Sequence, residues 1–489
     1  MTIWNVKPII LALAVGITLS ACKSLAPEYE QPQVSVPEAF KYDTPSQDAI
    51  QAASLGWQDY FADPRLHRLI EIALERNTNL RTAALNAEAT RAQYMITRAS
   101  RLPSIGGSGS ASRSRTAADL TGTGSGRVNE VYSVGLGITG YELDLFGKVR
   151  NNTDAALEGY FNSTAMRDAT HLTLVSTVAK AYFNQRYAEE SMALVQRVLK
   201  SREQTYRLTQ LKHQAGVVSA VDLRQQEALI ESAKADYAAA EQAKEQAVNA
   251  LVVLLNQPMP SDLPKGLPLT KQFKVSKLPA GLPSDILLNR PDVRAAEHAL
   301  KQANANIGAA RAAFFPSISL TSTIGTSSNE LIGLFKGFNR TWAFGPSINV
   351  PIFNWGSLKA SLDASKIRQE IQVVNYEAAV QSAFQDVANA LVAREQLDKA
   401  HAAKQKQGQA YAATLNLVNL RYKHGVASAL DLLDAERSSY GADTALLASQ
   451  LTRLENMADL YKALGGGLKR LSQDGEETTT TTPKALPSS

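Results

Sequence analysis

Two very long stretches of the chain carry apolar residues at three- and four-residue spacing. They cover 148–213 and 357–423, and neither contains proline. The pattern is clearest at Leu172, Leu174, Val175, Val178, Ala179, Tyr182 and Phe183. It predicts amphipathic helices, each ~100 Å long at 1.5 Å per residue, that must pack on neighbours along their whole length. A filamentous coiled coil would show the same pattern, so the helices alone do not decide the fold.

Shorter helices are predicted on either side of each long one. One pair, near 78–100 and 291–313, precedes the long stretches, and Pro291 suits the first turn of its helix. The other pair, 221–256 and 428–462, follows after a short turn that contains glycine. Each long helix is therefore expected to reverse into its successor.

Each half of the chain also has two segments in which apolar and small polar residues alternate. The predicted strands are 104–115, Ser133–Tyr141, Ser317–Thr326 and Thr341–Phe353, and the first has the weakest pattern. Gly-, Ser- and Thr-rich loops at 116–130 and 327–340 join each pair. Period-two patterning over about ten residues is typical of a membrane barrel with apolar residues outward. A soluble, half-buried sheet would also alternate.

Four strands are too few to close a barrel, and lipid does not tolerate open sheet edges. Two chains would give eight strands, three twelve and four sixteen. Because eight strands leave an interior about filled by side chains, a conduit needs at least three chains. The strand pattern therefore favours an oligomeric tube over a coiled coil.

The two halves are copies of one unit. Leu208–Leu223 matches Leu417–Leu432, and the turn glycines Gly216 and Gly425 are 209 residues apart. Pro103 with Ser104 corresponds to Pro316 with Ser317 at nearly the same offset. Each half therefore predicts the same order of helix, two strands, long helix and second helix.

The N-terminus is typical of an exported lipoprotein. The apolar run Ile9–Leu19 is too short to span a bilayer, and it ends in small residues before Cys22, the only cysteine. This pattern resembles the bacterial lipobox, which predicts cleavage after residue 21 and a covalent lipid on Cys22. Lys23 replaces the Asp that commonly retains lipoproteins at the inner membrane, which suggests sorting to the outer membrane. A plain secretory signal with an incidental cysteine is the alternative.

Composition and chemistry argue against catalysis and nucleic-acid binding. The net charge is +5 over 489 residues, with basic and acidic residues interspersed. The six histidines include no pair at metal-ligand spacing. The loop Gly122–Gly126 lacks the Lys-Ser/Thr of a phosphate-binding loop. We therefore expect no enzyme, no metal and no cofactor beyond the lipid on Cys22.

Several motifs resemble those of the TolC/OprM family of outer-membrane efflux proteins, particularly its lipoprotein branch. They are Tyr141–Gly147, Gly281–Asp292, Ile307–Ile318 and Leu432–Ser438. The resemblance implies an α+β membrane protein: a trimeric, 12-stranded transmembrane β-barrel with four strands per chain, continued by a 12-helix periplasmic α-barrel with a mixed equatorial domain. It also implies a lipid-anchored location in the bacterial outer membrane, extending into the periplasm.

The resemblance and the repeat together divide the chain into six segments. They are the signal peptide 1–21, an anchor and equatorial segment 22–77, the first repeat 78–256, an equatorial connector 257–290, the second repeat 291–462, and a C-terminal equatorial segment with a disordered tail, 463–489.

The resemblance places a periplasmic gate just after the second helix turn, at Leu430, Asp431, Asp434 and Arg437. Asp431 and Asp434 lie three residues apart and so near one face of a helix. In a trimer they would repeat around the bore, where carboxylates favour cations. The first repeat has Asp222, Gln225 and Ala228 at positions 431, 434 and 437, so the halves differ here. A solvated Asp–Arg pair of little energetic weight is the alternative.

The two turns resemble the family tips that meet a periplasmic adaptor protein. Their residues are Gly216, Val217, Val218, Ser219, Ala220, Gly425, Val426, Ala427, Ser428 and Ala429. Tight helix reversal alone would also explain the glycines.

These expectations describe a passive duct of a tripartite multidrug efflux system. Its partners would be two sister chains, an adaptor, an inner-membrane transporter of the resistance–nodulation–division type and outer-membrane lipid, with no nucleic acid. A duct for type I protein secretion and a coiled-coil lipoprotein without a pore remain the alternatives.

Overall fold

The computed structural model describes residues 24–35, 40, 55–120, 122, 124–274, 290–466, 469–471 and 477–479. The predicted signal peptide 1–21 and Cys22 lie outside the described residues. Parts of the predicted connector 257–290 and of the C-terminal segment 463–489 also lie outside them.

The chain folds into two compact units, and each takes segments from both sequence repeats. The first, named the sheet unit, contains Asn86–Thr164, Ala295–Glu377 and the described part of Met1–Gln33. The second, named the hairpin unit, contains the described parts of Val34–Leu85, Ala165–Arg294 and Ala378–Ser489. Each sequence repeat thus defines one order of helices and strands. Each compact unit, however, is packed from the equivalent parts of both repeats.

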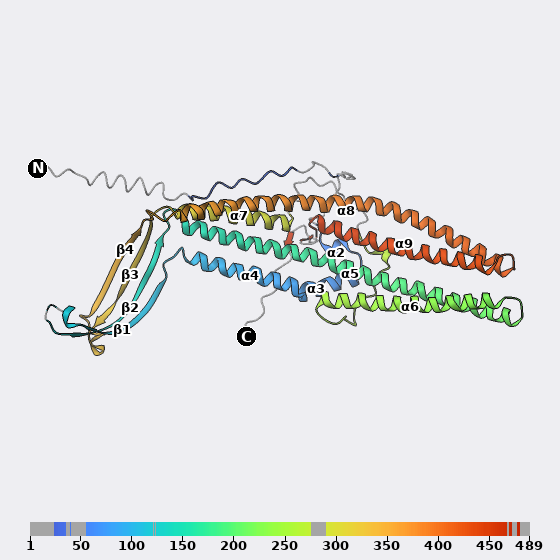
Figure 1. Ribbon diagram of the computed structural model, residues 1–489, viewed down its shortest axis with the longest axis horizontal. Coiled ribbons are helices and arrows are strands. Elements are labelled where there is room, and N and C mark those ends of the chain that lie inside the picture. The colour runs from blue at the N-terminus through green and yellow to red at the C-terminus, as the bar shows by residue number, and fades with distance from the viewer. Residues whose placement is uncertain are drawn as a thin grey trace. The chain divides into compact units, whose positions relative to one another are not determined.

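The sheet unit is built on four antiparallel strands in the order β1-β2-β3-β4 (Figure 1). Their bounds are β1 Ile105–Thr116, β2 Arg127–Leu143, β3 Ser317–Ser328 and β4 Arg340–Asn349. The pairing of β2 with β3 joins the two repeats. β1 and β4 are the outer strands of the sheet, so each has one edge without a partner strand among the described residues.

The two faces of this sheet differ in chemistry, as the alternation predicted. Directly paired residues lie on the same face. The apolar face includes the rungs Ile105–Ile138–Ser322–Phe344 and Gly107–Leu136–Ile324–Trp342. The polar face includes the rungs Gly106–Gly137–Thr323–Ala343 and Ser108–Gly135–Gly325–Thr341. One face is thus aliphatic and aromatic, and the other is almost entirely Gly, Ser and Thr.

β1 and β3 agree with their predicted ranges to within two residues, whereas β2 and β4 differ by more. β4 ends at Asn349 rather than Phe353, because its partner β3 begins only at Ser317 and because Pro351 has no N–H for a ladder bond. β2 begins at Arg127, six residues before the predicted start. Its first paired residues include Arg127, Asn129 and Glu130, and these polar side chains hide the alternation.

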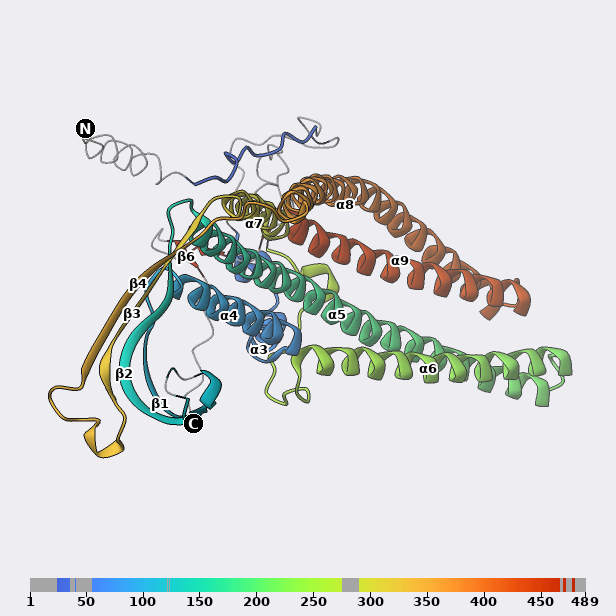
Figure 2. The ribbon, with the colours of Figure 1, turned by 60° about the vertical axis from the view of Figure 1, so that its left-hand side comes forward.

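The predicted long helices and their shorter partners are confirmed to within about two residues. They are α4 Thr78–Ala99, α5 Lys148–Gln214, α6 Ala220–Leu255, α7 Pro291–Ala312, α8 Ser357–Lys423 and α9 Ala429–Ala463. Figure 2 shows α5 beside α6 and α8 beside α9, which form two helical hairpins. The described residues also include α2 Trp57–Tyr60, α3 Pro64–Arg76, the single turns η2 Ala118–Leu120, η3 Leu269–Lys271 and η5 Leu331–Gly333, and the short pair β5 Lys469–Leu471 and β6 Glu477–Thr479.

The core of the hairpin unit lies where α2 and α3 meet α5, α6 and α9. The rings of Tyr60 and Tyr461 stack with centroids 4.3 Å apart, and Phe61, Phe183 and Phe273 pack around them. Tyr60, Phe61, Tyr461 and Phe183 are almost completely buried. Aromatic burial from distant parts of the chain therefore holds the base of the hairpins together.

A buried carboxyl group, Asp63, ties the connector between the repeats to this core. Its Oδ2 accepts hydrogen bonds from the Tyr182 hydroxyl (2.7 Å), the Leu267 N–H (2.7 Å) and the Gln272 amide (3.2 Å). Its Oδ1 accepts from the Arg65 N–H at 2.9 Å and so caps α3. Burial, followed by the bond to Asp63, raises the pKa of Tyr182, so its hydroxyl stays protonated as a donor.

A buried guanidinium group, Arg290, joins the start of α7 to α8 and α9. It pairs with Asp292 (2.7 Å) and Asp386 (3.1 Å) and donates to the Ala463 carbonyl at 2.9 Å. Arg290 is 6% exposed. Because a buried charge needs several partners, this group constrains all three helices at once.

The N-terminal segment lies along the sheet unit as an extended strap. The Ser24 hydroxyl donates to Asn151 (2.6 Å), Arg311 donates to the Leu25 carbonyl (3.1 Å), and Asn304 donates to the Pro27 carbonyl (2.8 Å). Further along, the Tyr29 hydroxyl donates to Glu297 at 3.3 Å. These bonds hold the start of the described chain to α5 and α7.

Candidate functional site at the hairpin tips

The two hairpin tips have the same backbone design. α5 ends before Gly216 (φ 70°) and α8 before Gly425 (φ 73°), both in the left-handed region that glycine adopts without strain. The Val217 N–H donates to the Lys212 carbonyl, and the Val426 N–H donates to the Arg421 carbonyl, each at 2.8 Å. These are Schellman bonds, which satisfy the last carbonyls of a helix. The glycines of the tips are therefore required for helix reversal.

The following helices also begin alike, each with a capping box. In α9 the Ser428 hydroxyl accepts from the Asp431 N–H (3.1 Å), and the Asp431 carboxylate accepts from the Ser428 N–H (2.9 Å). Ser219 and Asp222 make the same bonds at the start of α6. The bonds from the Ser428 backbone and hydroxyl lower the pKa of Asp431. Asp431 therefore has a capping role that the first repeat shares.

Asp434 and Arg437 are not matched in the first repeat. The Arg437 guanidinium donates to Asp434 at 3.0 Å along α9, and their side chains are 77% and 56% exposed. Leu430, one turn earlier, is 60% exposed. Both members of this pair belong to α9 and lie three residues apart. The structure thus brings the four predicted gate residues onto the first turns of one exposed helix.

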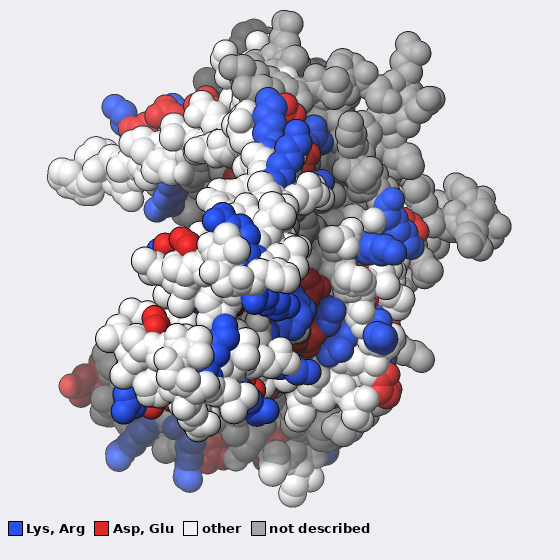
Figure 3. Space-filling view, turned by 90° about the vertical axis from the view of Figure 1, so that its right-hand side faces the viewer, with Lys and Arg blue, Asp and Glu red and all other residues white. Residues whose placement is uncertain are grey.

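The predicted docking residues form the exposed ends of the two hairpins. Val217 is 70% and Val426 66% exposed, whereas Val218, Ala427 and Ala429 are partly buried. Figure 3 looks onto this end of the molecule, where charged side chains of both signs are scattered among uncharged residues. Exposed valines at a tip have no folding role that the structure reveals.

Behind the tips, α9 carries a half-buried acid that sequence reasoning did not single out. Burial raises the pKa of Glu436, and the nearby Arg202 guanidinium of α5 partly offsets this shift. Arg202 is 7% exposed and donates to the Leu229 carbonyl of α6 at 2.9 Å. The Lys212 ammonium also lies 4.7 Å from the centre of the Tyr422 ring of α8. The Arg202–Glu436 and Lys212–Tyr422 contacts join the two hairpins across more than 200 residues of sequence. No local sequence pattern could therefore have predicted them.

Within the described residues, no cluster of three or more His, Cys, Asp or Glu side chains is arranged to hold a metal ion. No helix in the same part of the chain has the length and apolarity needed to cross a bilayer.

Comparison with known proteins gives one consistent result. The model of a family described as outer membrane efflux protein matches the chain over 69–257 and again over 282–466. The antibiotic efflux pump outer membrane protein ArpC of Pseudomonas putida is 44% identical over 481 residues, which are 97% of this chain and 99% of ArpC. The cation efflux system protein CusC of Escherichia coli is 40% identical over 94% of this chain and 98% of its own.

A solved structure gives the same answer in three dimensions. The open state of the MtrE outer membrane channel of Neisseria gonorrhoeae is 62% identical and matches with a TM-score of 0.85. The match covers 91% of this chain and 99% of that one. The double family match follows the internal repeat, and the fold match includes both compact units.

Proposed function

This chain belongs to the outer membrane efflux protein family and is an outer-membrane efflux channel rather than an enzyme, and from that premise we propose that it is the passive duct of a tripartite multidrug efflux system. We propose that it works as a homotrimer with a periplasmic adaptor and an inner-membrane transporter of the resistance–nodulation–division type. Substrates would pass from the periplasmic side to the exterior. The predicted channel function and outer-membrane location agree with its relatives.

The open edges of the sheet support the trimer. β1 and β4 each expose a row of backbone N–H and C=O groups, which cannot remain unpaired in lipid. Pairing β4 with β1 of the next chain would bury both rows, and three copies would give twelve strands. The Gly-, Ser- and Thr-rich polar face would then line a wide, wet bore, and the apolar face would contact lipid.

The difference between the repeats at Asp434 is the observation that carries the gate. Both tips share their glycine, their Schellman bond and their capping box, so folding explains those residues twice over. Folding explains neither Asp434 nor Arg437, whose counterparts are Gln225 and Ala228. We propose that Leu430, Asp431 and Asp434 form three-fold rings at the periplasmic constriction, with Asp434 as the selective charge and Arg437 as its partner.

Replacing Asp434 with alanine tests this gate. In planar bilayers the variant should conduct more than the unaltered channel, and its preference for cations over anions should fall about fivefold. A carboxylate contributes about 1 kcal/mol to a cation some 4 Å away in water. Gln225→Ala, at the equivalent position of the first repeat, should change neither quantity. Equal conductance and selectivity in both variants and the unaltered channel would refute the gate.

We propose that the exposed tips, Gly216–Ala220 and Gly425–Ala429, dock the adaptor. Single cysteines at Val217 and Val426 should form crosslinks to the adaptor, because these side chains project from the tips. A cysteine at the exposed residue Lys406 is the control, since it lies more than four helical turns of α8 away from the tip. Crosslinks that are equally frequent at Lys406 would show that the tips are not the docking surface.

A covalent lipid on Cys22 would anchor the duct. Ser24, two residues later, already bonds to Asn151 of the sheet unit. An attached lipid would therefore begin only two residues before that contact in the sequence.

The named substrates of the relatives support a duct without its own specificity. ArpC is named for antibiotic efflux and CusC for cation efflux, yet both match this chain over nearly its full length. We propose that the cognate transporter selects the cargo. These names also favour efflux over protein secretion.

A further inference from the structure

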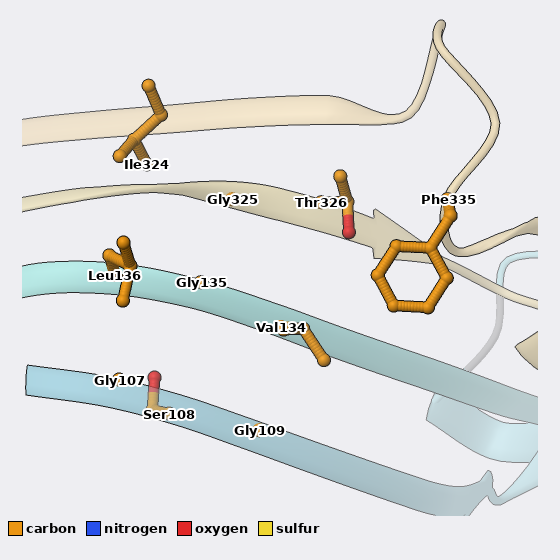
Figure 4. Close-up of a pocket in the computed structure, with 10 residues that line it drawn as sticks. All are labelled: Gly107, Ser108, Gly109, Val134, Gly135, Leu136, Ile324, Gly325, Thr326 and Phe335. Atoms are coloured by element: carbon orange, nitrogen blue, oxygen red, sulfur yellow. The ribbon is translucent and has the colours of Figure 1, made fainter.

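The apolar face of the sheet has a hollow that the channel function does not require. It is an open groove of about 480 Å³, and Figure 4 shows its lining residues on β1, β2 and β3 with Phe335 from the β3–β4 connection. The groove is deepest over β1, because Gly107 and Gly109 have no side chains, whereas their partners on β2 are Leu136 and Val134. A volume of this size is within the range of ligand pockets.

The lining residues are glycine or apolar apart from Ser108, whose position in the register belongs to the polar face, and Thr326. Val134, Leu136 and Ile324 are 43%, 59% and 69% exposed, and Phe335 is 79% exposed. The Thr326 hydroxyl oxygen is enclosed and has no hydrogen-bond partner within the described part of the chain. A groove with these walls suits acyl chains.

Arginines lie on the same face at the loop end of the groove. Arg340 belongs to the rung Gly109–Val134–Thr326–Arg340, so it projects on the groove's own face. Arg113 and Arg115 continue that face along β1, and all three are exposed. Glu130 pairs with Arg113 at 2.9 Å. Of these three arginines, Arg115 and Arg340 have no ion pair among the described residues. Guanidinium groups bind phosphate in a bidentate manner.

The position of the arginines along the strands determines which leaflet of the membrane they face. Helices follow β2 and β4 at one end of the sheet, whereas the β1–β2 and β3–β4 connections lie at the other. Because the helical parts of an outer-membrane efflux channel extend into the periplasm, the arginine end faces the exterior. From Ile348 to Arg340 the apolar face of β4 extends about 27 Å, close to the height of a lipid-facing band. Arg340 therefore lies where outer-leaflet headgroups begin, and Arg115 lies about 20 Å farther out along β1.

We propose that this groove and the arginines Arg115 and Arg340 bind a phosphorylated, multi-acyl glycolipid of the outer leaflet. Its phosphates would pair with the guanidinium groups, and an acyl chain would fill the hollow above Gly107 and Gly109. Sister chains would pair through the strand edges, so the face would stay accessible in the assembled channel. The inference rests on the membrane orientation of the channel and not on the proposed gate.

Binding of purified rough lipopolysaccharide to the full-length channel in detergent tests the proposal. The double variant Arg115→Gln with Arg340→Gln should bind at least about tenfold more weakly, because it loses two charge-assisted contacts. Gly109→Leu should weaken binding similarly by filling the hollow. A Cβ at this glycine would lie an unstrained 3.8 Å from Val134. Arg127→Gln is the matched control, since Arg127 pairs with Thr116 on the polar face at the same end.

Several results would overturn the proposal. One is unchanged lipopolysaccharide binding in both the double variant and Gly109→Leu. Another is a loss of binding in Arg127→Gln as large as that in the double variant. A third is competition for binding by dephosphorylated lipopolysaccharide, or by phosphatidylglycerol vesicles, that is as strong as competition by intact lipopolysaccharide. All variants should conduct ions like the unaltered channel, which separates this test from that of the gate.

Discussion

Replacing Asp63 with alanine is expected to destabilise the protein by about 3–7 kcal/mol. The substitution removes the cap of α3, which contributes about 1 kcal/mol. It also leaves the buried Tyr182 hydroxyl and Leu267 N–H without acceptors, at about 1–3 kcal/mol each. No other side chain among the described residues holds the connector to both α3 and α5 in this way. The loss should appear as a lower midpoint of chemical unfolding and as less assembled channel in the outer membrane.

Three further substitutions separate the carboxyl group's role from a general effect of mutation. Tyr182→Phe removes one of its donors and should cost only about 1 kcal/mol. Asp63→Asn keeps one oxygen for the cap and should fall between Tyr182→Phe and Asp63→Ala. Asp262→Ala removes an exposed acid from the same connector and should change stability by less than about 0.5 kcal/mol. If Asp63→Ala were as stable as Asp262→Ala, the carboxyl group would not be holding the connector.

The elements of this fold could be predicted closely because their signals are local. Gly216 and Gly425 end the long helices, and the alternation of Ser317–Ser328 matches its pairing residue by residue. The capping role of Asp431 could also have been predicted, since Ser428 precedes it by the spacing of a capping box. Sequence reasoning instead assigned Asp431 only to the gate.

The long-range contacts that hold the elements together could not be predicted in the same way. Asp63 meets Tyr182 across 119 residues and Gln272 across 209, and Arg290 meets Ala463 across 173. Periodicity reports which face of an element is buried but not which residue of another element it meets. The acid of Ala62-Asp63-Pro64 reads locally as a helix cap, and only the fold shows that it also accepts three long-range bonds.

The seam between the two repeats is a second place where one side chain decides the outcome. Gly135 of β2 pairs directly with Gly325 of β3 on the polar face. A Cβ on Gly135 would lie 2.9 Å from the Ile324 carbonyl oxygen, and one on Gly325 would lie 2.6 Å from the Gly135 Cα and closer still to the Val134 carbonyl oxygen. These neighbours are backbone atoms, which cannot rotate away. The strands can therefore approach this closely only where both residues lack side chains.

Gly325→Ala is accordingly expected to open the β2–β3 pairing and to reduce the amount of assembled channel in the outer membrane. Overpacking of about 1–3 kcal/mol corresponds to a five- to 150-fold shift in the pairing equilibrium. Gly345→Ala on β4 is the matched control, because a Cβ there meets nothing within 4 Å on the same polar face. The ratio of oligomer to monomer in membrane extracts measures the effect. Because this seam is the only pairing that joins the first repeat to the second within the four-stranded sheet, a chain that cannot form it would present two separate hairpins to its sisters. Equal assembly of the Gly325 and Gly345 variants would mean that the repeats are joined by their helices and not by the sheet.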